Sequence, residues 1–131
     1  MGGVVLRGDR VLLVKRGRAP LKGYWSIPGG VLESGERLEA GLRREVLEET
    51  GLRVKPLEIV EVFERILNDA QGRPEYHYVL IDYRCRVTGG TLAPDDDVSS
   101  AEWVPRAALK RYRMTNGTLR VIEEAFRNGT Q

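Results

Sequence analysis

Cysteine is nearly absent from this sequence, because Cys85 is the only one among 131 residues. A single cysteine excludes an internal disulfide and favours a reducing compartment, so we expect a cytoplasmic protein. Long apolar runs are also missing, and no stretch approaches the ~20 residues of a membrane-spanning helix. Residues 1–4 carry neither the basic segment nor the cleavage pattern of a secretory signal. We therefore expect no contact with a membrane.

A large excess of charge of one sign is missing as well, since the formal net charge is +2. This charge is too small for the basic stripe that is typical of nucleic-acid-binding domains, so a nucleic acid is not an expected partner. The apolar share of 41% is enough for a core and argues against disorder. The chain length suits one domain that spans residues 1–131.

The pattern of apolar residues predicts a mixture of strands and helices. The β-rich runs are 4–6, 11–14, 57–67, 76–87 and 101–104. Residues 17–35 are rich in Gly and Pro and indicate an ordered loop. Helices are expected at 37–50, with Gly51 as a left-handed cap, and at 116–127. Because the strands and helices do not alternate regularly, we expect either an α+β fold or a layered α/β/α sandwich with a mixed sheet.

The first expected helix carries an unusual group of acidic residues. Glu45, Glu48 and Glu49 are spaced at i, i+3 and i+4, so their carboxylates share one side of the helix. Carboxylates this close repel one another, and a hard divalent cation with oxygen ligands would remove the conflict. The alternative is a solvated acidic face with arginine pairs, which is common on helices.

The full spacing around this helix is more specific than the glutamates alone. Gly30 is followed by five residues, then Glu36, then seven residues, then Arg44-Glu45-Val46-Leu47-Glu48-Glu49-Thr50-Gly51-Leu52. This segment resembles the Nudix box, G-x5-E-x7-R-E-U-x-E-E-x-G-U with U an apolar residue, and meets every fixed position. The lead-in Trp25-x-x-Pro28-Gly29-Gly30 and the later Glu102-Trp103-Val104-Pro105 are similar to the same family.

The resemblance implies an α/β/α sandwich with a mixed sheet. It also implies an enzyme that hydrolyses a nucleoside diphosphate linked to a further moiety, with Mg²⁺ or Mn²⁺ as cofactor. Glu48 and Glu49 would be the principal metal ligands, and Glu45 would be a ligand or the general base. The backbone carbonyl of Gly30 would add a ligand, and Glu36 would pair with Arg44 to brace the loop against the helix. These roles make Glu36, Arg44 and Glu45 the expected catalytic group.

Further site residues are expected outside the box. In this family an acidic ligand often precedes the last strand, which selects Asp97, although a polar turn after Pro94 is an even alternative. Lys15, Arg16 and Lys22 are candidates for contacting phosphates, against the alternative of solvated surface charge. Tyr24 is a candidate for the wall of a base-binding site, although tyrosines near strands often serve only to pack.

The box identifies the diphosphate chemistry and not the leaving moiety. The resemblance favours ADP-ribose or a similar small-molecule nucleotide as the substrate. A MutT-type hydrolase of oxidised nucleoside triphosphates and a catalytically silent nucleotide sensor are the alternatives. Such a sensor should have lost glutamates of the box, and none is lost here. Dimerisation is common in the family, so a homodimer is possible.

Overall fold

The computed structural model describes residues 1–19, 21–94 and 98–129. In chain order, its strands are β1 (Gly2–Arg7), β2 (Arg10–Arg16), β3 (Trp25–Ser26), β4 (Leu52–Asn68), β5 (Pro74–Gly90) and β6 (Val98–Pro105). Its helices are α1 (Leu38–Thr50), the 3₁₀ helix η1 (Arg106–Arg111) and α2 (Asn116–Gly129).

The strands form a mixed sheet in the order β3-β2-β1-β5-β4, and β6 pairs with β2. β1 runs parallel to β5, whereas the other paired strands are antiparallel. The parallel pair places the start of β1 beside the middle of β5, with Gly2 opposite Asp82. This register places the start of the chain next to the long β4–β5 hairpin.

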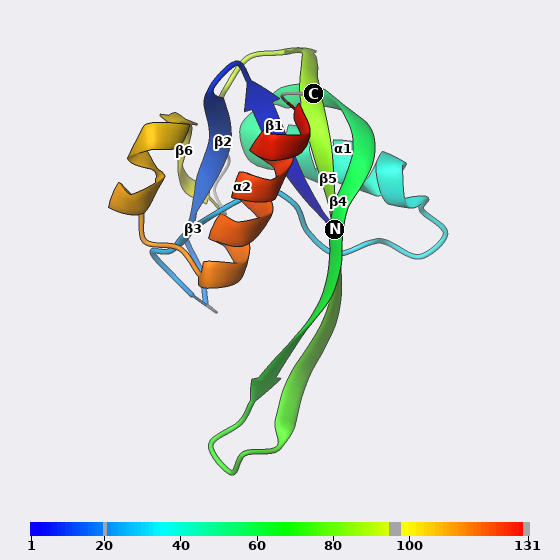
Figure 1. Cartoon of the computed structure of the whole chain (residues 1–131). Coiled ribbons are helices and arrows are strands. Elements are labelled where there is room, and N and C mark those ends of the chain that lie inside the picture. Colours follow the sequence, from blue (N-terminus) through cyan, green and yellow to red (C-terminus); the bar gives the residue numbers. More distant parts are fainter. Residues whose placement is uncertain (20, 95–97, 130–131) are drawn as a thin grey trace.

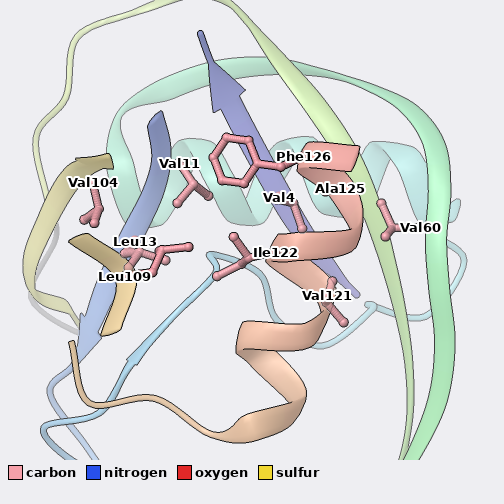
Figure 2. Close-up of a cluster of buried hydrophobic side chains, with 10 residues drawn as sticks. All are labelled: Val4, Val11, Leu13, Val60, Val104, Leu109, Val121, Ile122, Ala125 and Phe126. Atoms are coloured by element: carbon pink, nitrogen blue, oxygen red, sulfur yellow. The ribbon is translucent and has the colours of Figure 1, made fainter. Parts of the chain in front are cut away.

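The two helices cover opposite faces of the sheet (Figure 1). Because side chains alternate along a strand, β1 and β2 send Val4 and Val11 to one face and Val5 and Leu12 to the other. The first face packs against Val121, Ile122, Ala125 and Phe126 of α2, as Figure 2 shows. The second face packs against Leu42 and Val46 of α1. The predicted α/β/α sandwich with a mixed sheet is confirmed.

Helix α1 is fixed in register by its apolar stripe and by its end. Leu42 and Val46 are fully buried one helical turn apart, which orients the opposite side of the helix toward solvent. Gly51 ends the helix with φ 78°, and its N–H donates to the carbonyl of Leu47. A Cβ at Gly51 would overlap the carbonyl oxygen of Thr91, so only glycine fits this cap. The glutamates of the last two turns are therefore held at a fixed orientation.

Strands β4 and β5 form a hairpin that extends well beyond the sandwich (Figure 1). Their register pairs Phe63 with Leu80 and Arg65 with Tyr78, so these four side chains share one face of the hairpin. Glu61 and Asp82 are cross-strand partners on the same face, closer to the body. The turn is closed by Asp69, whose side chain accepts hydrogen bonds from the backbone of Gln71 and Arg73.

The predicted positions of strands and helices are confirmed, but every predicted strand is longer than expected, most of all β4, β5 and β6. The run predicted to begin at residue 57 begins at Leu52, because Leu52, Val54 and Pro56 are buried while Arg53 and Lys55 are exposed. This alternation of apolar and charged residues has the strand period of two and is visible in the sequence, and only Pro56 is unusual for a strand. Strand β5 extends to Gly90, and β6 begins at Val98 rather than residue 101. Among the described residues, no helix is long and apolar enough to cross a membrane.

Candidate functional site

Arg44 lies at the centre of an acidic network on the exposed side of α1. Its guanidinium binds Glu36 through two hydrogen bonds, from Nε at 2.7 Å and from Nη2 at 3.0 Å. Its Nη1 donates to Glu45 at 3.0 Å and to Glu48 at 3.2 Å. The predicted pairing of Glu36 with Arg44 is confirmed. It connects the loop before α1 to the second turn of the helix, because the fork of arginine matches a carboxylate.

The pKa values of the pair follow from this geometry. The hydrogen bond from Arg44, together with one from the backbone N–H of Glu33, lowers the pKa of Glu36 to about 2. The same contact raises the pKa of Arg44 above its ordinary value. Both groups are therefore ionised at any physiological pH, and the network keeps its charge-assisted hydrogen bonds.

Glu45 differs from Glu36 because it is directed toward the interior. Its side chain is only 18% exposed and lies against Gly30, where a Cβ would overlap its carboxylate. Burial raises the pKa of Glu45, and the hydrogen bond from Arg44 opposes that change without cancelling it. Position 30 therefore requires glycine, because a side chain there would occupy the space of the Glu45 carboxylate.

The other two glutamates lie at the end of the same face. Glu49 accepts a hydrogen bond from the backbone N–H of Gly29 at 3.0 Å, and Glu48 is more exposed and contacts Arg44. The loop at residues 28–30 is itself attached to β1, because Gly3 donates to the carbonyl of Pro28 at 2.9 Å. The carbonyl of Gly30 accepts from the α-amino group of Met1 at 2.9 Å. Strand β1, the loop and α1 therefore fix the position of Glu45 and Glu49.

A cavity of about 300 Å³ opens in front of these residues. Glu45, Glu48 and Glu49 line one side of it, and Arg16 and Arg18 line another. The predicted common side of the three glutamates is confirmed. We call this space the acidic cavity. Its combination of carboxylates and guanidinium groups suits a ligand that carries both cations and phosphate oxygens.

A second cavity of about 550 Å³ adjoins the first, and we call it the apolar cavity. It lies between the loop around β3, the start of α2 and the shared face of the hairpin that carries Phe63, Leu80 and Asp82. Most of its lining is apolar or aromatic, including Trp25, whose ring meets that of Tyr112 edge-on at 5.0 Å. The two cavities share Arg16, Ser26, Ile27 and Gly29.

The structure separates the predicted substrate-contact residues. Arg16 lines both cavities, and Tyr24 lines the apolar cavity with its hydroxyl 3.2 Å from Arg113. Lys15 lies on β2 and Lys22 is exposed in the following loop, and the described lining of neither cavity includes them. Asp97, the predicted ligand from the loop before the last strand, lies outside the described residues.

The carboxylates fit a metal ion by their chemistry but are not gathered around one point. Among the described residues, no three His, Cys, Asp or Glu side chains converge as a group that could hold a metal ion. The present partners explain this arrangement, because Arg44 holds Glu45 and Glu48 while Gly29 holds Glu49. Three carboxylates at one cavity still form the hard oxygen donor set that Mg²⁺ and Mn²⁺ prefer.

Asp82 is a site residue that the sequence does not reveal. It is 4% exposed and lines the apolar cavity. Its neighbours in the sequence are typical strand residues and form no motif. Burial raises the pKa of Asp82 to about 6, the α-amino group of Met1 opposes the rise, and Glu61 adds to it. Arg65 opposes it to a smaller extent. Only the register of β4 and β5 shows that Asp82 and Glu61 are neighbours, so no local sequence signal could have identified them.

The comparisons with known proteins agree with this geometry. The family model of the NUDIX domain matches residues 1–125. A relative in Methanocaldococcus jannaschii, named ADP-ribose pyrophosphatase, is 36% identical over 123 residues, which cover 90% of this chain and 70% of that protein. Mouse 8-oxo-dGDP phosphatase NUDT18 is 31% identical over 119 residues, and the match spans 88% of this chain but 34% of that protein.

A solved structure gives the same result for the fold. The crystal structure of a MutT NUDIX hydrolase from Burkholderia pseudomallei superposes with a TM-score of 0.80 at 28% sequence identity. The superposition covers 94% of this chain and 93% of that protein, so the described layers and the position of α1 are features that both proteins have.

Replacing Arg44 with Ala should lower the melting temperature by several degrees, because Glu36, Glu45 and Glu48 lose a common partner and repel one another. The measurement is thermal unfolding followed by circular dichroism at neutral pH. The neighbouring Arg43→Ala is the matched control, since Arg43 is exposed on the same helix turn. Equal melting temperatures for the two variants would contradict the central position of Arg44.

Asp82→Asn should stabilise the protein in a pH-dependent manner. Above pH 6 the wild-type carboxylate is ionised in both states, and its burial costs up to about 3 kcal/mol for a shift of about two pKa units. Below about pH 4 the group is protonated in the folded and unfolded states, so this cost disappears. The variant should therefore exceed wild type in free energy of unfolding at pH 8, with a difference that falls steadily toward pH 4.

Urea unfolding of both proteins at several pH values measures this difference. Glu75→Gln, which removes an exposed carboxylate from the same strand, is the control and should show no such trend. A difference between Asp82→Asn and wild type that stays constant from pH 8 to pH 4 would refute the burial of an ionisable carboxylate.

Proposed function

This chain belongs to the Nudix hydrolase family, and we propose that it cleaves the diphosphate linkage of ADP-ribose or a closely similar nucleoside diphosphate derivative. Hydrolases of this family act on such derivatives and generally use divalent metal ions. The cleavage adds water across one phosphoanhydride bond and releases two monophosphates from ADP-ribose.

The observation that supports this proposal best is the junction of the two cavities. The acidic cavity presents carboxylates and Arg16, whereas the apolar cavity beside it is lined by aromatic and aliphatic side chains. A nucleoside diphosphate derivative has the same division, because its phosphates are charged while its base is flat and largely apolar. Arg16 lines both spaces, so its guanidinium is placed to contact a phosphate at the boundary.

The glutamates of α1 would hold the cofactor. Mg²⁺ bound by Glu48, Glu49 and either Glu45 or the Gly30 carbonyl would neutralise phosphate charge and activate the attacking water. Glu45 is the candidate to accept a proton from that water when it is not a ligand, because its partly buried carboxylate faces the acidic cavity. Glu36 and Arg44 would act by positioning, since their bidentate pair holds the loop and the helix together.

The choice of ADP-ribose rests on the relatives. The M. jannaschii protein carries that substrate in its name and is 36% identical over 90% of this chain. A MutT-type hydrolase of oxidised nucleoside triphosphates is the second candidate, because the B. pseudomallei protein is called a MutT NUDIX hydrolase and the mouse relative is named an 8-oxo-dGDP phosphatase. The two candidates differ in the number of phosphates and in the group beyond the diphosphate, so a substrate panel separates them.

The test is a product assay with Mg²⁺ on ADP-ribose, NADH, diadenosine polyphosphates, nucleotide sugars, and ordinary and 8-oxo nucleoside triphosphates. We expect AMP and ribose 5-phosphate from ADP-ribose with the highest kcat/KM of the panel. Faster release of pyrophosphate from an 8-oxo nucleoside triphosphate would select the second candidate. Binding of a panel member without any hydrolysis would instead support the nucleotide sensor.

Glu48→Gln and Glu49→Gln should each lower kcat on the preferred substrate by on the order of 10²-fold or more, with little change in melting temperature. The amide keeps the shape of the side chain but loses the charge that a divalent cation requires. Glu39→Gln, an exposed change in the first turn of α1, is the control and should keep wild-type turnover. Wild-type turnover in both site variants would overturn the assignment of the metal ligands.

A further inference from the structure

The apolar cavity contains one carboxylate that the proposed chemistry does not use. Asp82 lies on β5 at the base of the hairpin, 4% exposed, and lines this cavity rather than the acidic one. Its side chain lies over Gly2, since a Cβ at position 2 would be 2.6 Å from Oδ1 of Asp82. Gly2 thus leaves room for a carboxylate that lines an otherwise mainly apolar space.

Asp82 lacks the partners that a buried carboxylate normally has. Within residues 1–19, 21–94 and 98–129, no hydrogen bond or ion pair to Asp82 is present. The nearby α-amino group of Met1 attracts it through space but donates its hydrogen bond to Gly30. Asp82 therefore lines the cavity without a protein donor among the described residues, and a ligand in the cavity can supply one.

The neighbouring Glu61 adds to the need for a hydrogen-bond donor near Asp82. It is the cross-strand partner of Asp82, and its Oε1 accepts from Arg120 of α2 at 3.0 Å. Its Oε2 is buried and, within the described part of the chain, has no hydrogen-bond partner. The charge of Glu61 raises the pKa of Asp82, so it disfavours a further acceptor near Asp82 and favours a donor. Arg65 lies further along the same face and, like the α-amino group of Met1, opposes this effect.

A flat ligand fits between this point and the aromatic residues around it. Phe63 lies next to Glu61 on the hairpin face, and Trp25 and Tyr24 line the cavity from the loop around β3. A nucleobase can place its faces against such rings while its edge reaches Asp82. The edge must present an N–H donor, because an ionised carboxylate can only accept.

We propose that Asp82 is a specificity-determining residue that accepts a hydrogen bond from the exocyclic amine of the substrate's nucleobase. This inference rests on the proposed function and makes the substrate more specific, because it selects amino-substituted bases such as adenine. Glu61 acts through Asp82 as a positioning residue, because its negative charge lies next to Asp82 on the neighbouring strand and favours a donor there. In the same pose, a base with a carbonyl oxygen in place of the amine, such as hypoxanthine, directs that acceptor at Asp82 and must shift to present its N1–H instead, so it is disfavoured.

The test compares ADP-ribose with inosine diphosphate ribose, which differ at this position of the base. Wild-type protein should prefer ADP-ribose by about 10- to 100-fold in kcat/KM with Mg²⁺. Asp82→Asn should remove or reverse the preference, because the amide can donate to the hypoxanthine oxygen. Asp82→Ala should remove the preference without reversing it. Glu64→Gln, on the opposite face of the same hairpin, is the control and should keep the wild-type ratio.

Equilibrium binding of both compounds in EDTA, measured by calorimetry, separates this inference from the proposed function. Loss of the adenine preference in Asp82→Asn supports the role of Asp82 even if neither compound is hydrolysed, in which case the proposed function alone fails. Equal affinity of wild type for both compounds, or no binding of either, overturns the inference. Hydrolysis of both compounds with the same wild-type ratio in all variants overturns the inference and leaves the proposed function intact.

Discussion

The arrangement of the site depends on the guanidinium of Arg44. It is held by two bonds to Glu36 on the loop and one bond to Glu45 on the helix, so a single cation fixes two segments of the chain. Without it, the loop before α1 would be attached mainly through backbone contacts to β1. Charge explains why an arginine is needed, because the same helix face carries Glu48 and Glu49 as well as Glu45, and these three carboxylates would otherwise repel one another.

The sheet supplies the second half of the site by bringing distant segments together. Parallel pairing places β1 beside β5, and the loop at residues 28–30 bonds to the start of β1. The acidic cavity forms where α1 meets the end of β2, the residues that follow it and the loop after β3. The apolar cavity forms between the hairpin, the loop around β3 and the start of α2.

The sequence was sufficient to predict the parts of the site that are local. The spacing within residues 37–50 predicted α1 and the shared side of its glutamates, because helix geometry converts spacing directly into direction. The pairing of Glu36 with Arg44 was implied by the family resemblance instead, since Glu36 lies in the loop before the helix. The first five residues of β4 were missed because Pro56 suggests a break between them and the run that begins at residue 57. Asp82 was missed for a different reason. Its importance comes from burial and from Glu61 across the strand, and a pairing between positions 61 and 82 leaves no local pattern.

Two kinds of carboxylate are therefore present within one site, and their surroundings indicate different ligands. The glutamates of α1 line one cavity, and the single charge of Arg44 offsets only part of theirs, so they suit a hard divalent cation with oxygen ligands. Asp82 is buried beside a mainly apolar cavity, where burial makes its charge costly and the neighbouring Glu61 adds to that cost, so its pKa rises to about 6. A neutral N–H donor satisfies such a group without bringing another charge into the apolar space. This contrast is the reason for proposing that the charged part of the substrate binds in one cavity and the neutral base in the other.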